Sequence, residues 1–451
     1  MKIIIVGCGK VGQTLAEKLN VDDHDVTVVD VSAEKVKTVS ERLDILGVVG
    51  NGASHTTLQE AGIAKADLFI AVTRSDELNL LCCMIAKKEG HCHTIARVKN
   101  PEYSQETAYL KRELGLSMVI NPEYAAAEEI ARVLRFPAAV KIEPFAKGKV
   151  ELIKFKLPQG NKLVGLSVKE MAMKLSPNVL VCMIERGEET YIPNGDSTFE
   201  ERDLISIVAT PKNAVEFFDK IEYKGNSIKD ALIVGGGAIT HYLCEILEHS
   251  KISVKVIEKD IQLCEELSSR WQKTTVIHGN AADKELLLEE GVEKAGAFVA
   301  LSCFDEENIL LSLFFKEAGR GKLITKINRT DYDSVINRLD LDTVICPKNI
   351  TADSIVRYVR AKQNTMGSNI EAMYNIGQGK AEVSEFIVRE NSPVTETPLS
   401  KLKFKKNVLI ASLSRGNEVI IPRGQDVIKA GDSVVVVSKN MPLLDVADVL
   451  R

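Results

Sequence analysis

Residues 7–12, GCGKVG, form a glycine-rich motif between a short apolar run and a segment with helical spacing. In such a G-x-G-x-x-G motif, Gly7 permits a tight turn, Gly9 lets a pyrophosphate approach the backbone, and Gly12 lets the helix pack close to the sheet. Free N–H groups and the positive end of the helix dipole then hold phosphates. Asp30 ends the next expected strand, where an acid accepts hydrogen bonds from ribose hydroxyls and disfavours the 2′-phosphate of NADP(H). The motif therefore predicts a dinucleotide site that prefers NAD(H).

A related motif lies in the second half of the chain, where residues 235–240 read GGGAIT. Gly235, Gly237 and the acid Glu258 keep the pattern, but Thr240 replaces the third glycine. A β-branched residue there should force helix and sheet apart. We therefore expect a second pocket that is altered, weaker for pyrophosphate, or empty. A glycine-rich turn without a ligand is the alternative interpretation of either motif.

Polar residues at strand ends complete the candidate sites. Each half has an asparagine, a hydroxyl residue and a basic residue after its third, fourth and fifth expected strands, where open α/β sheets bind ligands. Local turns, helix caps and solvated charges explain these residues equally well. The candidate contacts in the first half are Gly7, Cys8, Gly9, Lys10, Val11, Gly12, Asp30, Val31, Asn51, Thr73, Arg74 and Arg97. Those in the second half are Gly235, Gly237, Ala238, Ile239, Glu258, Asn280, Ser302 and Lys326.

The elements that must position these residues occur twice. ADLFIAVTRSDELN from Ala66 matches AGAFVALSCFDEEN from Ala295, an offset of 229 residues. Short apolar runs alternate with helical segments in each copy, which predicts a doubly wound parallel sheet. A smaller, mainly β pattern follows each copy, and YIPNGDSTFEERD from Tyr191 matches IIPRGQDVIKAGD from Ile420. Asp203 and Asp432 correspond in this match.

The fold class is thus α/β, with two Rossmann-like domains that are each followed by a small β-rich (α+β) domain. Pro144 and Gly148 read as markers of the first large-to-small junction. The expected nucleotide-binding domains are residues 1–136 and 230–364. The expected small regulatory domains are residues 137–223 and 368–451.

Bulk composition narrows the class of protein. The chain has 451 residues and a formal net charge of −5, which argues against a generally basic surface for nucleic acid. No apolar run approaches the ~20 residues that span a bilayer, and the N-terminus lacks signal-peptide features. We therefore expect a cytoplasmic protein that reaches a membrane only through a partner.

Nine cysteines in a chain without a secretion signal are expected to be reduced. A metal site among Cys82, Cys83, His91, Cys92 and His93 is conceivable, but no CxxC or HxxxH spacing occurs there. The apolar context LNLLCCMIA favours buried thiols, and we assign no metal ligand.

The whole chain resembles the peripheral-subunit family of the Trk potassium-uptake system, on the segments IIIVGCGKVGQTLAEKL, GNGAS and ARVKNPEY and on the doubled large-and-small unit. Each half resembles a regulator-of-potassium-conductance module. The resemblance implies that the large domains bind NAD(H), with ATP or ADP as alternative ligands. It also implies a homotetrameric ring at the inner face of the membrane, bound to an integral membrane potassium-translocating subunit. Thr240 departs from the pattern and leaves the second site in question.

An NAD-dependent dehydrogenase is the alternative, because its nucleotide domain would look the same. It would need a proton donor or acceptor beside the nicotinamide, often His or Lys. All seven histidines lie within the two expected nucleotide domains, and neither small domain has one. We therefore expect a regulator without catalytic residues. A scaffold that binds no ligand is opposed by the intact first motif.

Overall fold

The structure is a computed structural model of the chain. It describes residues 1–451 except 101–102, 104–105, 137–138, 176–177, 188, 224–227, 249, 330–335, 340, 365–369, 377–379, 417, 440 and 442. All three expected domain boundaries, near 137, 224–229 and 365–368, fall on or beside residues outside this set.

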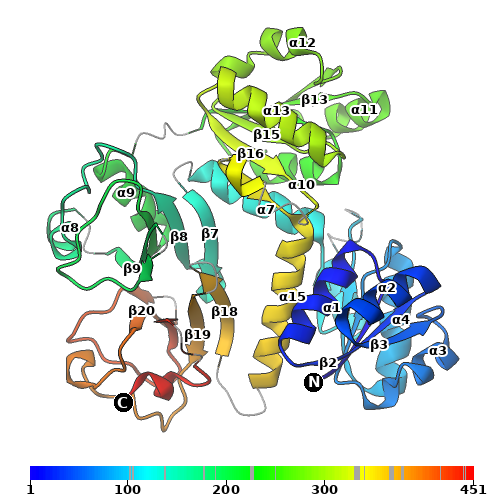
Figure 1. Cartoon of the computed structure of the whole chain (residues 1–451), viewed down its shortest axis with the longest axis horizontal. Helices are drawn as coiled ribbons and strands as arrows, with labels where there is room; N and C mark the ends of the chain where they lie inside the picture. The colour runs from blue at the N-terminus through cyan, green and yellow to red at the C-terminus, as the bar shows by residue number, and fades with distance from the viewer. Residues whose placement is uncertain are drawn as a thin grey trace. The chain divides into compact units, whose positions relative to one another are not determined.

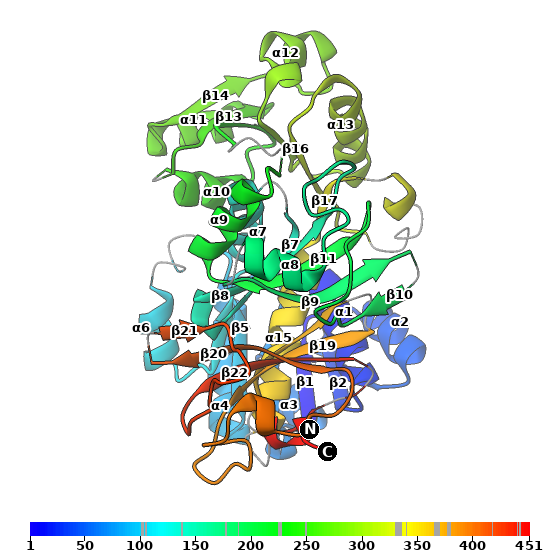
Figure 2. The same cartoon turned by 90° about the vertical axis from the view of Figure 1, so that its left-hand side faces the viewer.

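The described residues form two compact units, and each unit draws on both halves of the chain. Unit 1 comprises Met1–Ile130 and Asp230–Val356, and unit 2 comprises Ala131–Lys229 and Arg357–Arg451. Figures 1 and 2 show their elements from two directions.

Unit 1 holds two six-stranded parallel sheets. Their strand orders, β3-β2-β1-β4-β5-β6 and β14-β13-β12-β15-β16-β17, are the doubly wound Rossmann order, so the predicted fold class is confirmed. The first sheet consists of β1 (Lys2–Val6), β2 (Asp25–Asp30), β3 (Leu46–Val49), β4 (Leu68–Ala71), β5 (His93–Arg97) and β6 (Met118–Ile120). The second consists of β12 (Asp230–Val234), β13 (Ser253–Glu258), β14 (Thr274–His278), β15 (Ala297–Ala300), β16 (Lys322–Lys326) and β17 (Thr343–Ile345).

Helices connect the strands of these sheets, and α7 and α15 follow the last strand of each sheet. The first set is α1 (Lys10–Val21), α2 (Ala33–Leu43), α3 (His55–Glu60), α4 (Asp76–Gly90), α6 (Thr107–Glu113) and α7 (Pro122–Arg135), with the 3₁₀ turn η1 (Ile63–Lys65). The second set is α10 (Ala238–Leu247), α11 (Ile261–Arg270), α12 (Lys284–Glu289), α13 (Asp305–Ala318) and α15 (Pro347–Asn364), with η3 (Val292–Lys294) and η4 (Asn337–Leu339).

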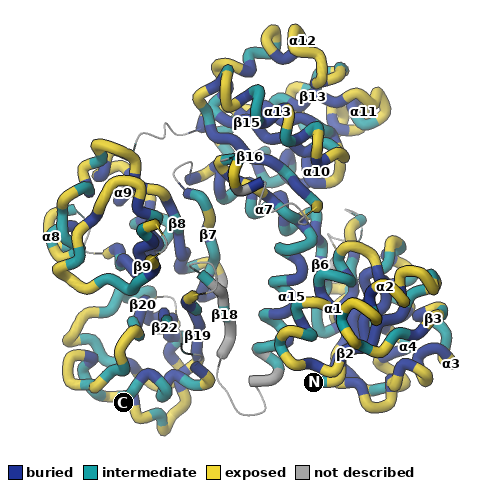
Figure 3. The backbone as a smooth tube through the Cα atoms, viewed as in Figure 1, coloured by how far each residue is buried: buried dark blue, intermediate teal, exposed yellow. Residues whose placement is uncertain are grey.

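Burial follows from the apolar sequence of the central strands. All four residues of β15, AFVA, are buried, because helices cover both faces of a parallel sheet. Helix α12 lies at the surface and buries only Leu287. Figure 3 shows this contrast. Cys82 and Cys83 are also buried, as their apolar context predicted, and so is Cys92.

Unit 2 holds two five-stranded antiparallel sheets with equivalent orders, β10-β9-β11-β8-β7 and β21-β20-β22-β19-β18. The small β-rich fold is therefore confirmed in both halves. The first copy consists of β7 (Ala139–Phe145), β8 (Val150–Lys156), β9 (Leu180–Arg186), β10 (Glu189–Tyr191) and β11 (Leu204–Ala209), with α8 (Val168–Lys174), α9 (Pro211–Lys220) and η2 (Ala146–Gly148). The second consists of β18 (Ile370–Ile376), β19 (Ala381–Ile387), β20 (Val408–Arg415), β21 (Glu418–Ile420) and β22 (Ser433–Lys439), with η5 (Leu399–Lys401) and η6 (Val446–Val449).

The interpretation of Pro144 and Gly148 as junction markers was wrong. Pro144 lies inside β7, which pairs with β8, and Gly148 lies in the turn of that hairpin with a φ of +84°. A proline is tolerated here because β7 is an edge strand, where a missing N–H breaks no ladder.

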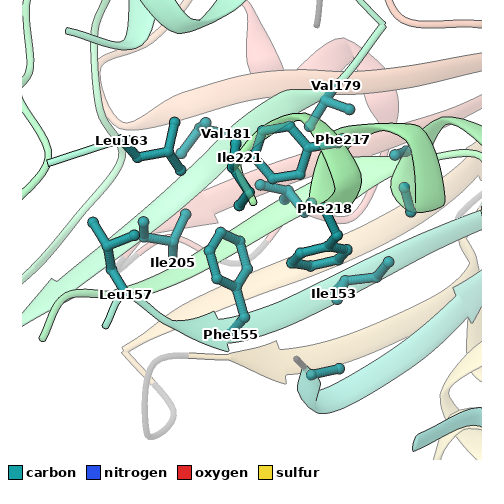
Figure 4. Packing of buried hydrophobic residues seen from close by; sticks show 14 of the residues in the cluster. Ile153, Phe155, Leu157, Leu163, Val179, Val181, Ile205, Phe217, Phe218 and Ile221 are labelled. Atoms are coloured by element: carbon teal, nitrogen blue, oxygen red, sulfur yellow. The ribbon is translucent and has the colours of Figure 1, made fainter. Parts of the chain in front are cut away.

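The core of the first small copy is aromatic. Phe155 of β8 makes edge-to-face contacts with Phe217 and Phe218 of α9, with ring centroids 6.1 and 5.1 Å apart. Ile153 and Ile205 belong to the same cluster, and Figure 4 shows them beside these rings. A second cluster joins the two copies, since Leu152 packs with residues of the other sheet that include Val435.

One repeated ion pair links strand ends to loops in both small copies. Arg186 donates from Nε and Nη2 to the two carboxylate oxygens of Asp203, each at 2.8 Å. Arg415 makes the same bidentate pair with Asp432, at 2.8 and 2.7 Å. Both aspartates are fully buried, which explains why the sequence match retains them at equivalent positions.

Candidate nucleotide sites

The first glycine of each motif adopts a conformation that excludes other residues. Gly7 has a φ of +105° and Gly235 a φ of +100°. A Cβ on Gly7 would also lie 3.0 Å from backbone atoms of Val72 and Thr73. By contrast, a Cβ on Gly9 or Gly237 would meet nothing within 4 Å. The middle glycine therefore borders the open space that a phosphate group would need.

The third motif position differs between the halves. A Cβ on Gly12 would lie only 1.8 Å from the carbonyl oxygen of Gly7, so no side chain fits there. Thr240 is fully buried in the equivalent place, and its hydroxyl donates to the carbonyl oxygen of Gly235 at 2.5 Å. The start of α10 must therefore meet its turn in a different geometry from the start of α1.

The acid at the end of the second strand binds the glycine loop in both halves. Asp30 accepts from the backbone N–H of Cys8 at 2.7 Å and of Ser32 at 2.9 Å. Glu258 accepts from the N–H of Gly236 at 2.5 Å and of Asp260 at 2.8 Å. Each carboxylate oxygen keeps a lone pair for a ribose hydroxyl. Asp30 is half-buried, whereas Glu258 is 9% exposed, so the first acid is the more accessible.

The remaining candidate residues around the first motif have mixed environments. The Cys8 side chain is buried, and burial raises the pKa of its thiol to about 12. Lys10 and Arg74 are exposed, Val11 is half-buried and Val31 is 74% exposed.

The strand-end residues all have local partners. The Asn51 side chain accepts from the N–H of Ala53 at 3.0 Å, and Asn280 does the same with Ala282. These are turn-stabilising contacts, one of the two interpretations left open by the sequence. Thr73 donates to the Asn79 side chain at 2.7 Å. The Ser302 hydroxyl forms local hydrogen bonds with the backbone of Phe304, at 3.2 and 3.3 Å.

The basic residues that end the fifth strands, Arg97 of β5 and Lys326 of β16, have partners nearby. The Nη2 of Arg97 lies 3.0 Å from a carboxylate oxygen of Glu123, at the start of α7. Lys326 donates to the carbonyl oxygen of Leu301 at 3.2 Å. Burial lowers the pKa of Lys326, although the nearby carboxylates of Asp305 and Glu123 act in the opposite direction.

Sequence reasoning missed a buried asparagine that holds the strand ends together. The Asn308 amide accepts from the N–H of Ser302 at 2.8 Å and donates to the carbonyls of Ser302 and Lys326, at 3.1 and 3.0 Å. Asn79 makes the equivalent three bonds in the first half. The repeated D-x-x-N in SDELN and FDEEN was the available signal.

The aspartate of the same D-x-x-N pattern fixes the next loop. Asp76 accepts from the N–H groups of Lys99 and Asn100, at 2.9 and 2.8 Å. Asp305 does the same with Asn328 and Arg329, at 3.0 and 2.8 Å. The two residues therefore set the shape of the crevice at the carboxyl ends of the strands.

In the second half these elements enclose a cavity of about 560 Å³. All eight candidate residues of that half line it, so the structure brings them together. Residues that the sequence did not single out also line it, and they include Glu123, Lys259, Cys303, Phe304 and Asn328.

Comparison with known proteins shows which family has this architecture. The TrkA-N domain family model matches residues 3–122 and 231–347, and the TrkA-C domain model matches residues 152–222 and 383–449. A TrkA homolog 1 of the Trk potassium uptake system from Methanosarcina mazei is 33% identical over 446 residues, covering 97% of each chain. The Halomonas elongata protein TrkA is 33% identical over 441 residues, covering 96% of this chain and 95% of its own. The chain belongs to the TrkA family of Trk potassium uptake proteins.

Solved structures share the fold of this TrkA-family chain. The GsuK RCK domain superposes with a TM-score of 0.64 at 16% identity, covering 97% of this chain and 92% of its own. The GsuK channel bound to NAD also gives 0.64 at 16% identity, covering 97% of this chain and 77% of its own. Within the described part of this TrkA-family chain, no helix has the length and apolar character to cross a bilayer.

Proposed function

We propose that this chain is a nucleotide-sensing regulatory subunit that gates an integral membrane potassium-translocating partner. Its ligand is NAD(H), with ATP or ADP as alternatives. The observation that carries the proposal is the paired site geometry. Each half has a turn at a glycine with positive φ and a middle glycine that borders open space. In each half an acid at the end of the second strand accepts a hydrogen bond from the glycine loop. In the second half these features open onto a cavity of a size that suits a nucleotide.

The residues fit a nucleotide at both turns. The backbone around Gly9 and Gly237 would hold phosphate, and Asp30 and Glu258 would accept from ribose hydroxyls. Bound NAD(H) would supply a redox-dependent signal in the nicotinamide ring. We propose that residues 1–136 and 230–364 form the nucleotide domains, and that residues 137–223 and 368–451 form the regulatory domains.

We further propose that the chain assembles as a homotetrameric ring at the cytoplasmic face of the membrane, bound to its partner. The internal repeat supplies two similar modules per chain, and closed symmetry is the usual arrangement of such units. The relatives are named for a potassium uptake system, and one structure with this fold is a channel bound to NAD.

A dehydrogenase remains the competing function, because the nucleotide fold is common to both. The absence of histidine from both small domains in the sequence supports the regulatory proposal. NADH incubated with the chain and a panel of small carbonyl acids should show no turnover. Sustained NADH consumption that a Gly9→Val variant abolishes would support the enzyme instead.

Gating is tested by reconstitution. The chain is added to liposomes that contain a Trk membrane subunit, and rubidium tracer uptake is measured with and without NADH, ATP or ADP. The proposal predicts that at least one nucleotide changes uptake and that Asp30→Ala with Glu258→Ala abolishes the response. If no nucleotide changes the rate of rubidium uptake while the chain is folded and bound to the membrane subunit, the regulatory role is refuted.

A further inference from the structure

An exposed aromatic ring lines the cavity of the second half. Phe304 lies between β15 and α13, and 58% of it is exposed. Lys259, which follows Glu258 at the end of β13, lines the same cavity. Its Nζ lies 5.6 Å from the centroid of the Phe304 ring. The ring and the cation therefore meet across the gap between two loops that border the site.

The first half has a different pair of residues at these positions. Ser75 replaces the phenylalanine, and its hydroxyl caps α4 by accepting from the N–H of Leu78 at 3.2 Å. Val31 replaces the lysine. In the second half Phe304 occupies the N-cap position of α13 but provides no capping hydrogen bond. The second half thus has a large apolar side chain at a position where serine, threonine, asparagine and aspartate are strongly preferred. Departures of this kind from local preference are expected at functional sites.

We infer that Phe304 and Lys259 form a nucleobase subsite in the second half, where a purine stacks on the ring of Phe304. The inference rests on the proposed nucleotide binding and specifies which end of the ligand this half recognises. A ring has two faces, so a base can stack on the face that Lys259 leaves open. Lys259 lies over the opposite face of the ring and adds positive charge beside Glu258, the proposed ribose acceptor.

This subsite offsets part of the weaker phosphate binding that we expect in the second half. Thr240 changes the fit between helix and turn, and Ala238 stands where the first half has the cation Lys10. Stacking on an aromatic side chain is worth roughly 5- to 150-fold in affinity per base, and a purine presents two fused rings to that side chain where a pyrimidine presents one. The second half should therefore distinguish purine from pyrimidine nucleotides more strongly than the first half does.

The test uses the full chain with Asp30→Ala, which weakens the first site, and calorimetric titration with ADP. Phe304→Ala should weaken ADP binding at the second site roughly 5- to 150-fold. Phe304→Tyr keeps the ring and should restore most of the affinity, whereas Phe304→Leu keeps apolar bulk and should not. Pyrophosphate lacks a base, so its binding should be the same in all four proteins.

The Glu258→Ala chain and the chain without substitutions serve as controls. In a Glu258→Ala chain, which reports the first site, Phe304→Ala should leave ADP affinity unchanged. Equal ADP affinity at the second site with Phe and with Ala at position 304 would overturn the base subsite and leave nucleotide binding intact. The same applies if leucine restores affinity as well as tyrosine. If the chain without substitutions binds no nucleotide at either site, the proposed function fails, and the subsite fails with it.

Discussion

The hydroxyl of Thr240 donates to the carbonyl oxygen of Gly235 at 2.5 Å, in the place where the first half has Gly12 and no room for a side chain. One residue therefore changes the junction of turn and helix on which phosphate binding depends. A ligand shifts a conformational equilibrium only through its differential affinity for the two states. Sites of unequal affinity would let one chain respond to two ranges of nucleotide concentration.

Thr240→Gly should raise the affinity of the second site for pyrophosphate-containing ligands by about 3- to 10-fold, since α10 can then approach its turn as α1 does. Affinity at the first site should stay nearly constant. Site-resolved calorimetry in an Asp30→Ala background measures the change. Thr240→Val is the matched control, because it keeps the branched shape without the hydroxyl and should not tighten binding. A glycine variant that binds no better than threonine would show that the third position does not limit this site.

Asp30→Ala should lower the affinity of the first site for NADH and ATP by roughly ten- to a hundredfold, because a charge-assisted hydrogen bond contributes about 1.5–3 kcal/mol. Both ligands carry the adenosine ribose, so both should be affected. The change also frees the N–H of Cys8, which Asp30 now binds at 2.7 Å. Asp30→Asn keeps one carbonyl acceptor and should show an intermediate loss. Unchanged calorimetric affinity in a folded Asp30→Ala chain would contradict the ribose assignment.

Asn308→Ala should destabilise the second nucleotide domain by about 1–3 kcal/mol, because it leaves one partly buried N–H and two partly buried carbonyl groups without their partner. Hydrogen exchange at the N–H of Ser302 should accelerate, and thermal melting should shift downward. Asn308→Asp keeps the acceptor and loses the donor, so it separates the two roles. Exchange at Ser302 as slow as in the unchanged chain would show that the amide does not hold the strand ends.

Cys303 is exposed and lines the cavity of the second half, so a thiol reagent should report occupancy of that site. Burial raises the pKa of Cys8 and Cys82 to about 12, so at about pH 8 both remain protonated and unreactive. Their thiolates would form only as the pH approaches those raised values. We predict one fast labelling phase that Cys303→Ser removes and that ADP slows. A fast phase that is indifferent to saturating nucleotide would place the ligand away from this cavity.

The glycine turns and the acids were predictable because each acts through its neighbours in the chain, and the eight predicted residues of the second half do share one cavity. Asn308 was not singled out, because an asparagine inside an apolar helix shows its role only through partners such as Lys326 on another strand. The strand β7 was missed because its proline suggested a boundary, and only the sheet order shows that it lies at an edge. Phe304 resembled an ordinary apolar residue until the structure placed its ring beside Lys259.

The central claim is that one chain carries two nucleotide sites of unequal strength. The most direct measurement is a calorimetric titration of the purified chain with NADH, NAD, ATP and ADP, repeated with Asp30→Ala and with Glu258→Ala. The account predicts two sites per chain, the tighter one lost with Asp30→Ala and the weaker one with Glu258→Ala. Binding of no nucleotide, or tighter binding in the second half than in the first, would contradict it.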